Sequence, residues 1–87
     1  MKAVITVIGK DMVGIMAKVS TTCAEANANI LEVTQSVLQE YFAMIMLIDI
    51  GKLNCSLDEL REKLRTNVSD MKIHVMHEDI FNSMHRI

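Results

Sequence analysis

Two hydrophobic periods alternate along the chain, and their order constrains the fold more than any other feature of the sequence. Residues 2–8 are rich in Val, Ile and Thr, a composition typical of a strand. Over residues 15–26 the apolar positions recur every three or four residues, as on one face of a helix. Two further strand-like runs, residues 30–38 and 41–50, follow with only the pair Gln39-Glu40 between them, which favours a hairpin.

The second half of the chain predicts another helix, a strand and a short terminal helix. Ser56 and Glu59 have the spacing of a capping box, in which the two side chains cap the start of a helix. The apolar positions after them lie on one helical stripe. Residues 71–75 alternate between apolar and polar side chains and predict a fourth strand. Residues 79–86 predict a short helix that buries three apolar side chains, namely Ile80, Phe81 and Met84.

The order strand, helix, strand, strand, helix, strand predicts an α+β domain with the ferredoxin-like βαββαβ fold over residues 1–87. Right-handed crossovers then give a four-stranded antiparallel sheet with two helices on one face, to which the short C-terminal helix is added. The run from Tyr41 to Ile48 has no polar face, so we expect this strand to be buried on both sides. Because the second face of the sheet is otherwise uncovered, the sequence predicts a dimer.

Charge and composition exclude several classes of partner. The chain of 87 residues has a formal net charge of -2 and no basic run, whereas a nucleic-acid-binding protein carries a positive stripe. No apolar stretch reaches the roughly 18 residues that a membrane span requires. The two cysteines do not form a disulfide framework, which favours a reducing, cytoplasmic setting. We therefore expect no nucleic acid and no membrane among the partners.

Gly9 and Gly14 follow the first strand with the glycine spacing of a phosphate-binding P-loop. Ile15 and Met16 come next, however, where a P-loop has the lysine and the hydroxyl residue that bind phosphate and magnesium. We therefore exclude a nucleotide site. One reading that remains is a strand-to-helix turn with Asp11 as the N-cap, in which the free N–H groups of the helix attract a carboxylate. The other is a purely structural turn, in which Gly14 serves only close packing.

The same turn resembles a motif of ACT domains. Residues Asp11 to Ile15 resemble the D-x-x-G-I/L/V turn of that family, and Asn29-Ile30 resembles the N-I pair that opens its second strand. The segment from Gln35 to Phe42 is similar to the Q-S/T-V-L-x-E-Y-F segment of the small stand-alone ACT proteins of bacteria and archaea. The resemblance covers essentially the whole chain, which makes residues 1–87 a single ACT-like domain.

The resemblance implies a regulatory, non-enzymatic protein that binds a small molecule, usually an amino acid in this family, between paired domains. The turn before the first helix would offer N–H groups to the ligand carboxylate. The asparagine of the second strand would reach the ligand from the neighbouring domain. Carried over by position, the ligand-binding residues are Gly9, Asp11, Met12, Val13, Gly14, Ile15, Asn29 and Ile30.

The partners implied by the resemblance begin with a second copy of the chain, as a homodimer or a tetramer. ACT domains usually regulate a fused enzyme or DNA-binding domain, and this sequence has neither. Its regulatory signal would therefore pass to a separate regulated protein, or the protein would act through its own assembly into oligomers. The alternative function is a ligand-free interaction module that docks another protein on its open sheet face or its edge strand.

No residues of the sequence indicate catalysis or a metal centre. His74 and His77 lie three apart on the expected fourth strand, so we expect their side chains to point to opposite faces. Cys23 belongs to the apolar stripe of its helix, and nothing in the sequence marks a base for Cys23 or Cys55. We expect no enzyme activity, no cofactor and no metal.

Overall fold

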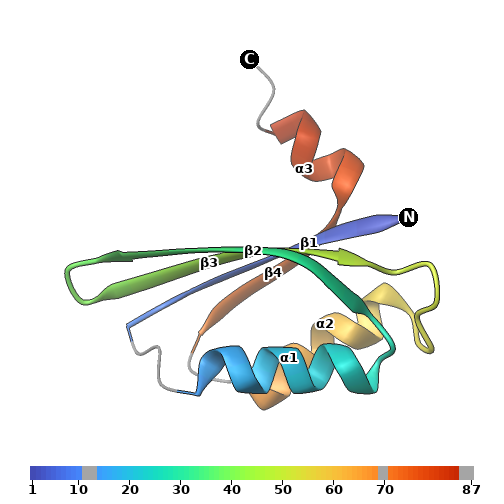
Figure 1. Cartoon of the computed structure of the whole chain (residues 1–87), viewed down its shortest axis with the longest axis horizontal. Coiled ribbons are helices and arrows are strands. Elements are labelled where there is room, and N and C mark those ends of the chain that lie inside the picture. The colour runs from blue at the N-terminus through green and yellow to red at the C-terminus, as the bar shows by residue number, and fades with distance from the viewer. Residues whose placement is uncertain (11–13, 69–70, 85–87) are drawn as a thin grey trace.

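The elements of the chain follow the order expected from the sequence. The computed structural model describes residues 1–10, 14–68 and 71–84. Figure 1 shows the helices labelled α1 and α2 on one side of a sheet and the helix labelled α3 on the other side. In chain order the elements are β1 (Lys2–Gly9), α1 (Ile15–Glu25), β2 (Asn29–Leu38), β3 (Tyr41–Asp49), α2 (Leu57–Asn67), β4 (Lys72–His77) and α3 (Glu78–Met84).

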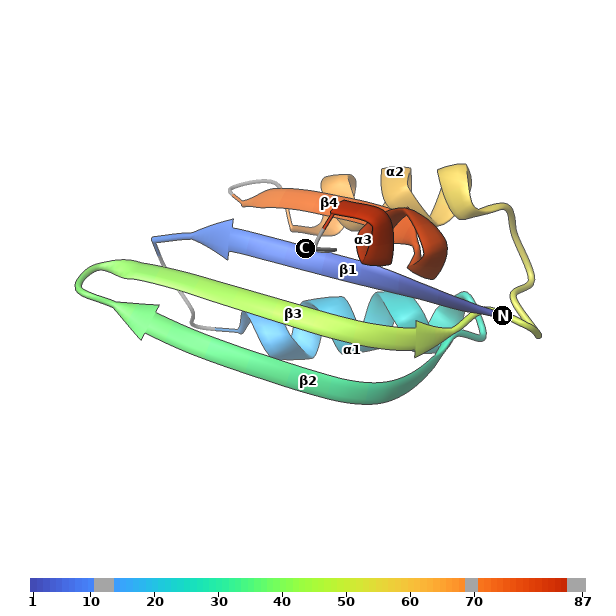
Figure 2. The same ribbon diagram turned by 90° about the horizontal axis from the view of Figure 1, so that it is seen from above.

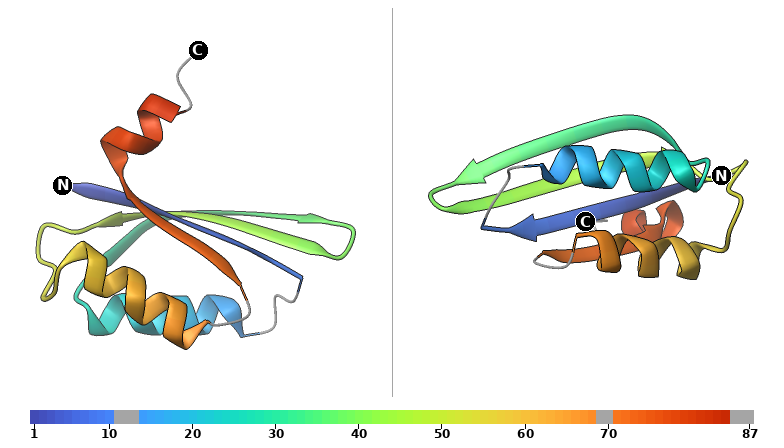
Figure 3. Two further views of the ribbon diagram at one scale, coloured as in Figure 1. Left: turned by 180° about the vertical axis from the view of Figure 1, so that it is seen from behind. Right: turned by 90° about the horizontal axis from the view of Figure 1, so that it is seen from below.

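The sheet has four strands in the order β2-β3-β1-β4, which Figure 2 shows from above, and each neighbouring pair is antiparallel. α1 and α2 contact each other on one face of this sheet, as Figures 1 and 3 show. The arrangement confirms the predicted ferredoxin-like fold, including its C-terminal helix. β2 and β4 are the edge strands, so their outer backbone groups are the ones left for contacts beyond the sheet.

The core lies between the sheet and the layer of α1 and α2. Ile5 in the middle of β1 pairs with Met46 of β3 and with Val75 of β4, and all three side chains are buried. Val19 of α1 and Leu64 of α2 are buried in the same cluster. Alternate residues of the central strands therefore point into this core, and the residues between them point to the other face.

The other face of β3 is only partly covered within the chain, so one chain alone does not give the burial on both sides that the sequence predicts. Ile45 is 44% exposed and Tyr41 is 46% exposed, whereas Phe42 and Met44 between them are buried. The reason is that α1 and α2 both cover the opposite face (Figure 1). The uncovered face is termed the open face, and its central residues are Thr6, Ile8, Ala43, Ile45, Leu47, His74 and Met76.

α3 rises from the open face instead of lying flat on it, as Figures 1 and 3 show. It follows β4 with no connecting residue and contacts only β1 and β4 within the described part of the chain. Phe81 is half-buried, but Ile80 is 56% exposed, so the prediction that the terminal helix buries Ile80 is wrong. The physical reason is the missing loop, because α3 continues directly from β4 and leads the chain away from the sheet. The Met84 side chain and residues 85–87 lie outside what the structure describes.

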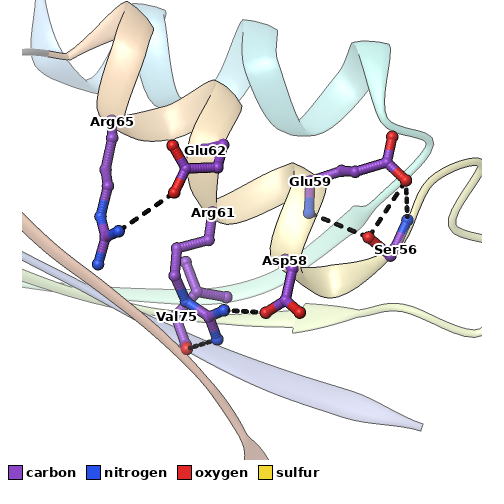
Figure 4. A network of polar contacts seen from close by, with 7 residues as sticks. All are labelled: Ser56, Asp58, Glu59, Arg61, Glu62, Arg65 and Val75. Atoms are coloured by element: carbon purple, nitrogen blue, oxygen red, sulfur yellow. Dashed lines mark hydrogen bonds and ion pairs between the residues drawn. The ribbon is translucent and has the colours of Figure 1, made fainter.

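α2 begins with the capping box expected at Ser56, which is drawn in Figure 4. The Glu59 N–H donates to Ser56 Oγ at 3.1 Å, and the Ser56 N–H donates to Glu59 Oε1 at 3.4 Å. In the next turn, Arg61 Nη2 donates to the Val75 carbonyl at 2.7 Å, and Arg61 also pairs with Asp58. Arg61 therefore binds the backbone of the edge strand β4 and ties α2 to it.

Candidate functional site

The turn before α1 contains the first group of predicted ligand-binding residues. α1 begins at Ile15, and its N-cap is Gly14 with φ 74° and ψ -3°. The N-cap is thus Gly14 rather than Asp11, and Asp11, Met12 and Val13 themselves lie outside the described residues. A Cβ added to Gly14 would meet no described atom within 4 Å. The left-handed backbone, rather than crowding, is therefore what requires glycine at this position.

The N-terminal end of α1 carries a positive potential that its own first turn does not offset. Gly14 provides no side-chain cap, and the first turn of α1 contains no acidic residue. The first turn of α2, by contrast, has the complete capping box together with Asp58 and Glu59. A helix N-terminus with about half a positive charge attracts an anion such as a carboxylate.

Two other predicted residues near this turn have structural surroundings of their own. Gly9 ends β1 opposite Phe42, and a Cβ added to it would lie 1.6 Å from Met71 Sδ. Met71 therefore already fills the space that a side chain at Gly9 would need. The Ile15 side chain is buried in the core, so only its backbone faces the turn.

Asn29 and Ile30 lie at the opposite end of α1 from Gly14. They open β2, where they pair with Asp49 and Ile48 of β3. The eleven residues of α1 separate the two ends by about 17 Å, at 1.5 Å per residue. One chain therefore does not bring Gly14 and Asn29 to a common ligand.

Asn29 lines a depression of about 700 Å³ that the sequence did not suggest. Asp49 and Lys52 line it as well, so charges of both signs lie next to Asn29. Asn27 shapes its wall, because its φ of 62° turns the chain after α1 and its Nδ2 donates to the Lys52 carbonyl at 2.7 Å. Asn27 was the signal for a tight, polar junction here, because asparagine tolerates the positive φ that it adopts.

The other candidate chemical groups do not assemble into a reactive site. Cys23 is fully buried, and desolvation raises the pKa of its thiol to about 11, so it is a poor nucleophile. His77 accepts a hydrogen bond from the Asp79 N–H at 3.2 Å, so it serves the start of α3. Within residues 1–10, 14–68 and 71–84 there is no group of three His, Cys, Asp or Glu side chains that could hold a metal ion. Among these same residues, no helix has the length and hydropathy to cross a membrane.

Comparison with known proteins gives this fold and these residues a family context. A family model described as ACT domain matches residues 2–78. A UPF0237 protein of Listeria monocytogenes is 46% identical over the full length of both chains. A UPF0237 protein of Methanopyrus kandleri is 43% identical and covers 99% of this chain and 98% of its own. The solved ACT domain protein from Streptococcus pneumoniae superimposes with a TM-score of 0.79 at 37% identity, covering 98% of each chain.

Proposed function

Because the chain belongs to the ACT domain family, we propose that it is a regulatory protein that binds an amino acid at a site built by two copies of the chain. The observation that carries the proposal is the start of α1. It begins at a left-handed glycine, with no side-chain cap from that glycine and no acid in its first turn. The α-carboxylate of an amino acid supplies the hydrogen-bond acceptors and the negative charge that suit such a helix end.

A second chain enters the proposal because Gly14 and Asn29 lie beyond opposite ends of α1, which is about 17 Å long. If two chains pair through β2 and α1 in opposite directions, Gly14 of one chain faces Asn29 of its partner. The side-chain hydrogen bonds to the two edge strands differ, and the difference supports pairing of the two chains through β2. Among the described residues, no side chain donates to or accepts from the backbone of β2, whereas Arg61 binds the Val75 carbonyl on β4.

The mechanism we propose is a shift between two arrangements of the dimer. The ligand contacts both subunits only in one arrangement, so binding raises the population of that arrangement. The coupling should be about 1–3 kcal/mol, which is the usual range for two linked sites. The signal then passes to a separate regulated protein. We place the protein in the cytoplasm because Cys23 and Cys55 are both free thiols.

Thermal unfolding in the presence of each of the twenty amino acids, at millimolar concentration, tests the ligand class. A ligand at 100 times its Kd adds about 2.7 kcal/mol to the free energy of unfolding. In a domain of this size that is a rise in Tm of many degrees. We expect one or a few amino acids to give such a rise and the others to give none.

Two substitutions of one glycine separate ligand contact from backbone strain. Gly14→Ala and Gly14→Leu both force a side chain into φ 74°, at a similar cost of about 1–2 kcal/mol. Only leucine extends into the open space beyond Gly14. Gly14→Leu should therefore abolish the ligand-induced rise in Tm, while Gly14→Ala retains part of it. If Gly14→Leu responds like the parent, the carboxylate site is elsewhere.

Mixing two inactive variants tests whether the site is shared between chains. Each site of the proposed dimer uses Gly14 of one chain and Asn29 of its partner. A heterodimer of Gly14→Leu and Asn29→Ala chains therefore contains one intact site and one doubly altered site. After subunit exchange in a one-to-one mixture, half of the dimers are heterodimers, so ligand binding should reappear at about one quarter of the parent's stoichiometry. No recovery after subunit exchange would contradict a site shared in this way.

A ligand-free interaction module is the second candidate function, and the open face favours it. Ile8 is 47% exposed there and Ile45 is 44% exposed, which is apolar surface suited to a protein partner. This function predicts no rise in Tm with any amino acid, in the parent or in the Gly14 variants. It also predicts that substitutions on the open face, rather than at Gly14, remove the biological output.

A further inference from the structure

The open face contains an apolar depression next to α3. Its volume is about 340 Å³, and Ile8, Ala43, Ile45, Met76 and Phe81 provide its apolar walls. Figure 2 shows α3 above β1 and β4, while the length of β2 is left bare. Ile8 and Ile45 remain nearly half exposed in this region. The depression is therefore an apolar surface that α3 of the same chain borders without filling.

α3 itself lacks enough contacts to be stable on its own. It has seven residues, and isolated helices below about 12 residues are marginal in water. Figure 1 shows it directed away from its own sheet, and Ile80 on it is 56% exposed. A short helix in this position is stabilised when a second apolar surface packs against it.

We propose that the open face binds the open face of a second copy of this chain, with each α3 packed on the depression of its partner. The two-fold axis lies parallel to the sheets and perpendicular to the strands, above the paired residues Thr6 and His74. Each α3 then lies over the Ile8 end of the partner's sheet. This contact uses neither Gly14 nor the β2 edge, so it does not depend on the ligand site.

The charges at the two ends of the open face select this orientation. α3 begins with Glu78 and Asp79, next to the Ala3 end of β1. Lys2 and Asp49 are register partners at the same end and offset each other's charge, so the two carboxylates of α3 are in excess there. Lys72 pairs with Ile8 at the other end of the same strand pair, about 17 Å away at 3.4 Å per residue. A two-fold axis perpendicular to the strands brings the acidic end of each chain over the basic end of its partner. An axis parallel to the strands would instead place like ends together.

The area of the contact also requires α3. Four strands about 4.8 Å apart, with about eight residues each, give the open face a footprint of roughly 500 Å². A standard interface removes about 800 Å² from each partner. α3 contributes the difference when it packs on the partner's sheet, because it then adds apolar contact surface to both chains.

A charge exchange between two variants tests the orientation. The Glu78→Lys/Asp79→Lys double variant places positive charge opposite Lys72 of its partner, and Lys72→Glu places negative charge opposite the acids of α3. We expect each variant alone to lose the open-face association in analytical ultracentrifugation. A one-to-one mixture should restore it, because both contacts of the mixed pair join opposite charges. Lys63→Glu, on the exposed surface of α2, is the control that should associate like the parent.

A second variant keeps α3 unchanged, since lysines at the start of a helix also weaken the helix itself. Ile45→Lys alters an exposed residue at the centre of the open face. It should raise the Kd of self-association at least tenfold while leaving the thermal response to amino acids intact. The proposal is overturned if the parent stays monomeric at millimolar concentration, or if Ile45→Lys associates like the parent. It is also overturned if both charge variants fold but their mixture fails to associate.

Discussion

Gly9 on β1 and Met71 before β4 are packed so closely that a Cβ on Gly9 would lie 1.6 Å from Met71 Sδ. The Met71 thioether is the end of a flexible side chain and can move aside, so we expect Gly9→Ala to lower the free energy of unfolding by about 1 kcal/mol, the low end of the range for overpacking. The midpoint of urea unfolding, at an unchanged denaturant slope, measures the loss.

Met71→Ala provides the matched background for this experiment. It removes the sulfur that a Cβ on Gly9 would meet, so Gly9→Ala should cost less in Met71→Ala than in the parent. The same cost in both backgrounds would show that Met71 is not the reason for glycine at residue 9.

Gln39 at the β2–β3 hairpin has φ 56°, a conformation that costs a non-glycine residue about 1–2 kcal/mol. Gln39→Gly should remove this strain, and the greater entropy of glycine in the unfolded chain offsets part of the gain. We expect a net rise in the free energy of unfolding of about 0.5 kcal/mol. Glu40→Gly, at a neighbouring position without positive φ, is the control and should lower the free energy of unfolding.

The strands and helices were predictable because their hydrophobic periods differ. The Val, Ile and Thr content of residues 2–8 and the four-residue spacing from Ile15 to Cys23 correspond to β1 and α1 in the structure. The hairpin was predicted without a glycine, and the structure has Gln39 in the left-handed region there. The pattern could not show this strain, because positive φ at glutamine has no compositional signal.

The candidate site and α3 were less predictable, because both depend on geometry between elements. The sequence resemblance groups Asn29 with Gly14, yet the two residues lie beyond opposite ends of α1. The helical period predicts the buried face of α1, but it does not predict which residues meet at either end of the helix. Ile80 has the spacing of a buried residue, but the direct passage from β4 to α3 turns it away from the sheet. Periodicity indicates which side chains share a face, not whether another element covers that face.

A hydrogen bond between the two helices of the core layer should contribute measurably to stability. Asn67 Nδ2 donates to Thr22 Oγ1 at 2.8 Å, and Thr22 Oγ1 donates to the Lys18 carbonyl at 2.8 Å. Thr22 is buried, so removal of the Asn67 amide leaves the buried Thr22 Oγ1 with one hydrogen bond fewer. The double-mutant cycle of Thr22→Val and Asn67→Ala should give a coupling energy of about 0.5–1.5 kcal/mol. A coupling energy of zero would mean that the two helices are joined by apolar packing alone.

The buried thiol of Cys23 should make the stability of the fold fall in alkaline solution. Burial raises its pKa from 9.0 to about 11, so the unfolded chain loses this proton at a lower pH than the folded chain. The contribution is present in full below pH 9 and is lost as the pH rises from 9 to 11. Its size is at most about 2.7 kcal/mol, from 1.36 kcal/mol per pKa unit between pH 9 and pH 11.

Urea unfolding of the parent and of two cysteine variants, at intervals from pH 8 to pH 11, isolates this effect from the other groups that titrate in alkali. Cys23→Ala should be less stable at pH 8, because it leaves a cavity, but should lose less stability as the pH rises. Cys55→Ala retains Cys23 and should therefore follow the parent. Parallel curves for the parent and Cys23→Ala would mean that the thiol ionises as readily in the folded chain as in the unfolded one.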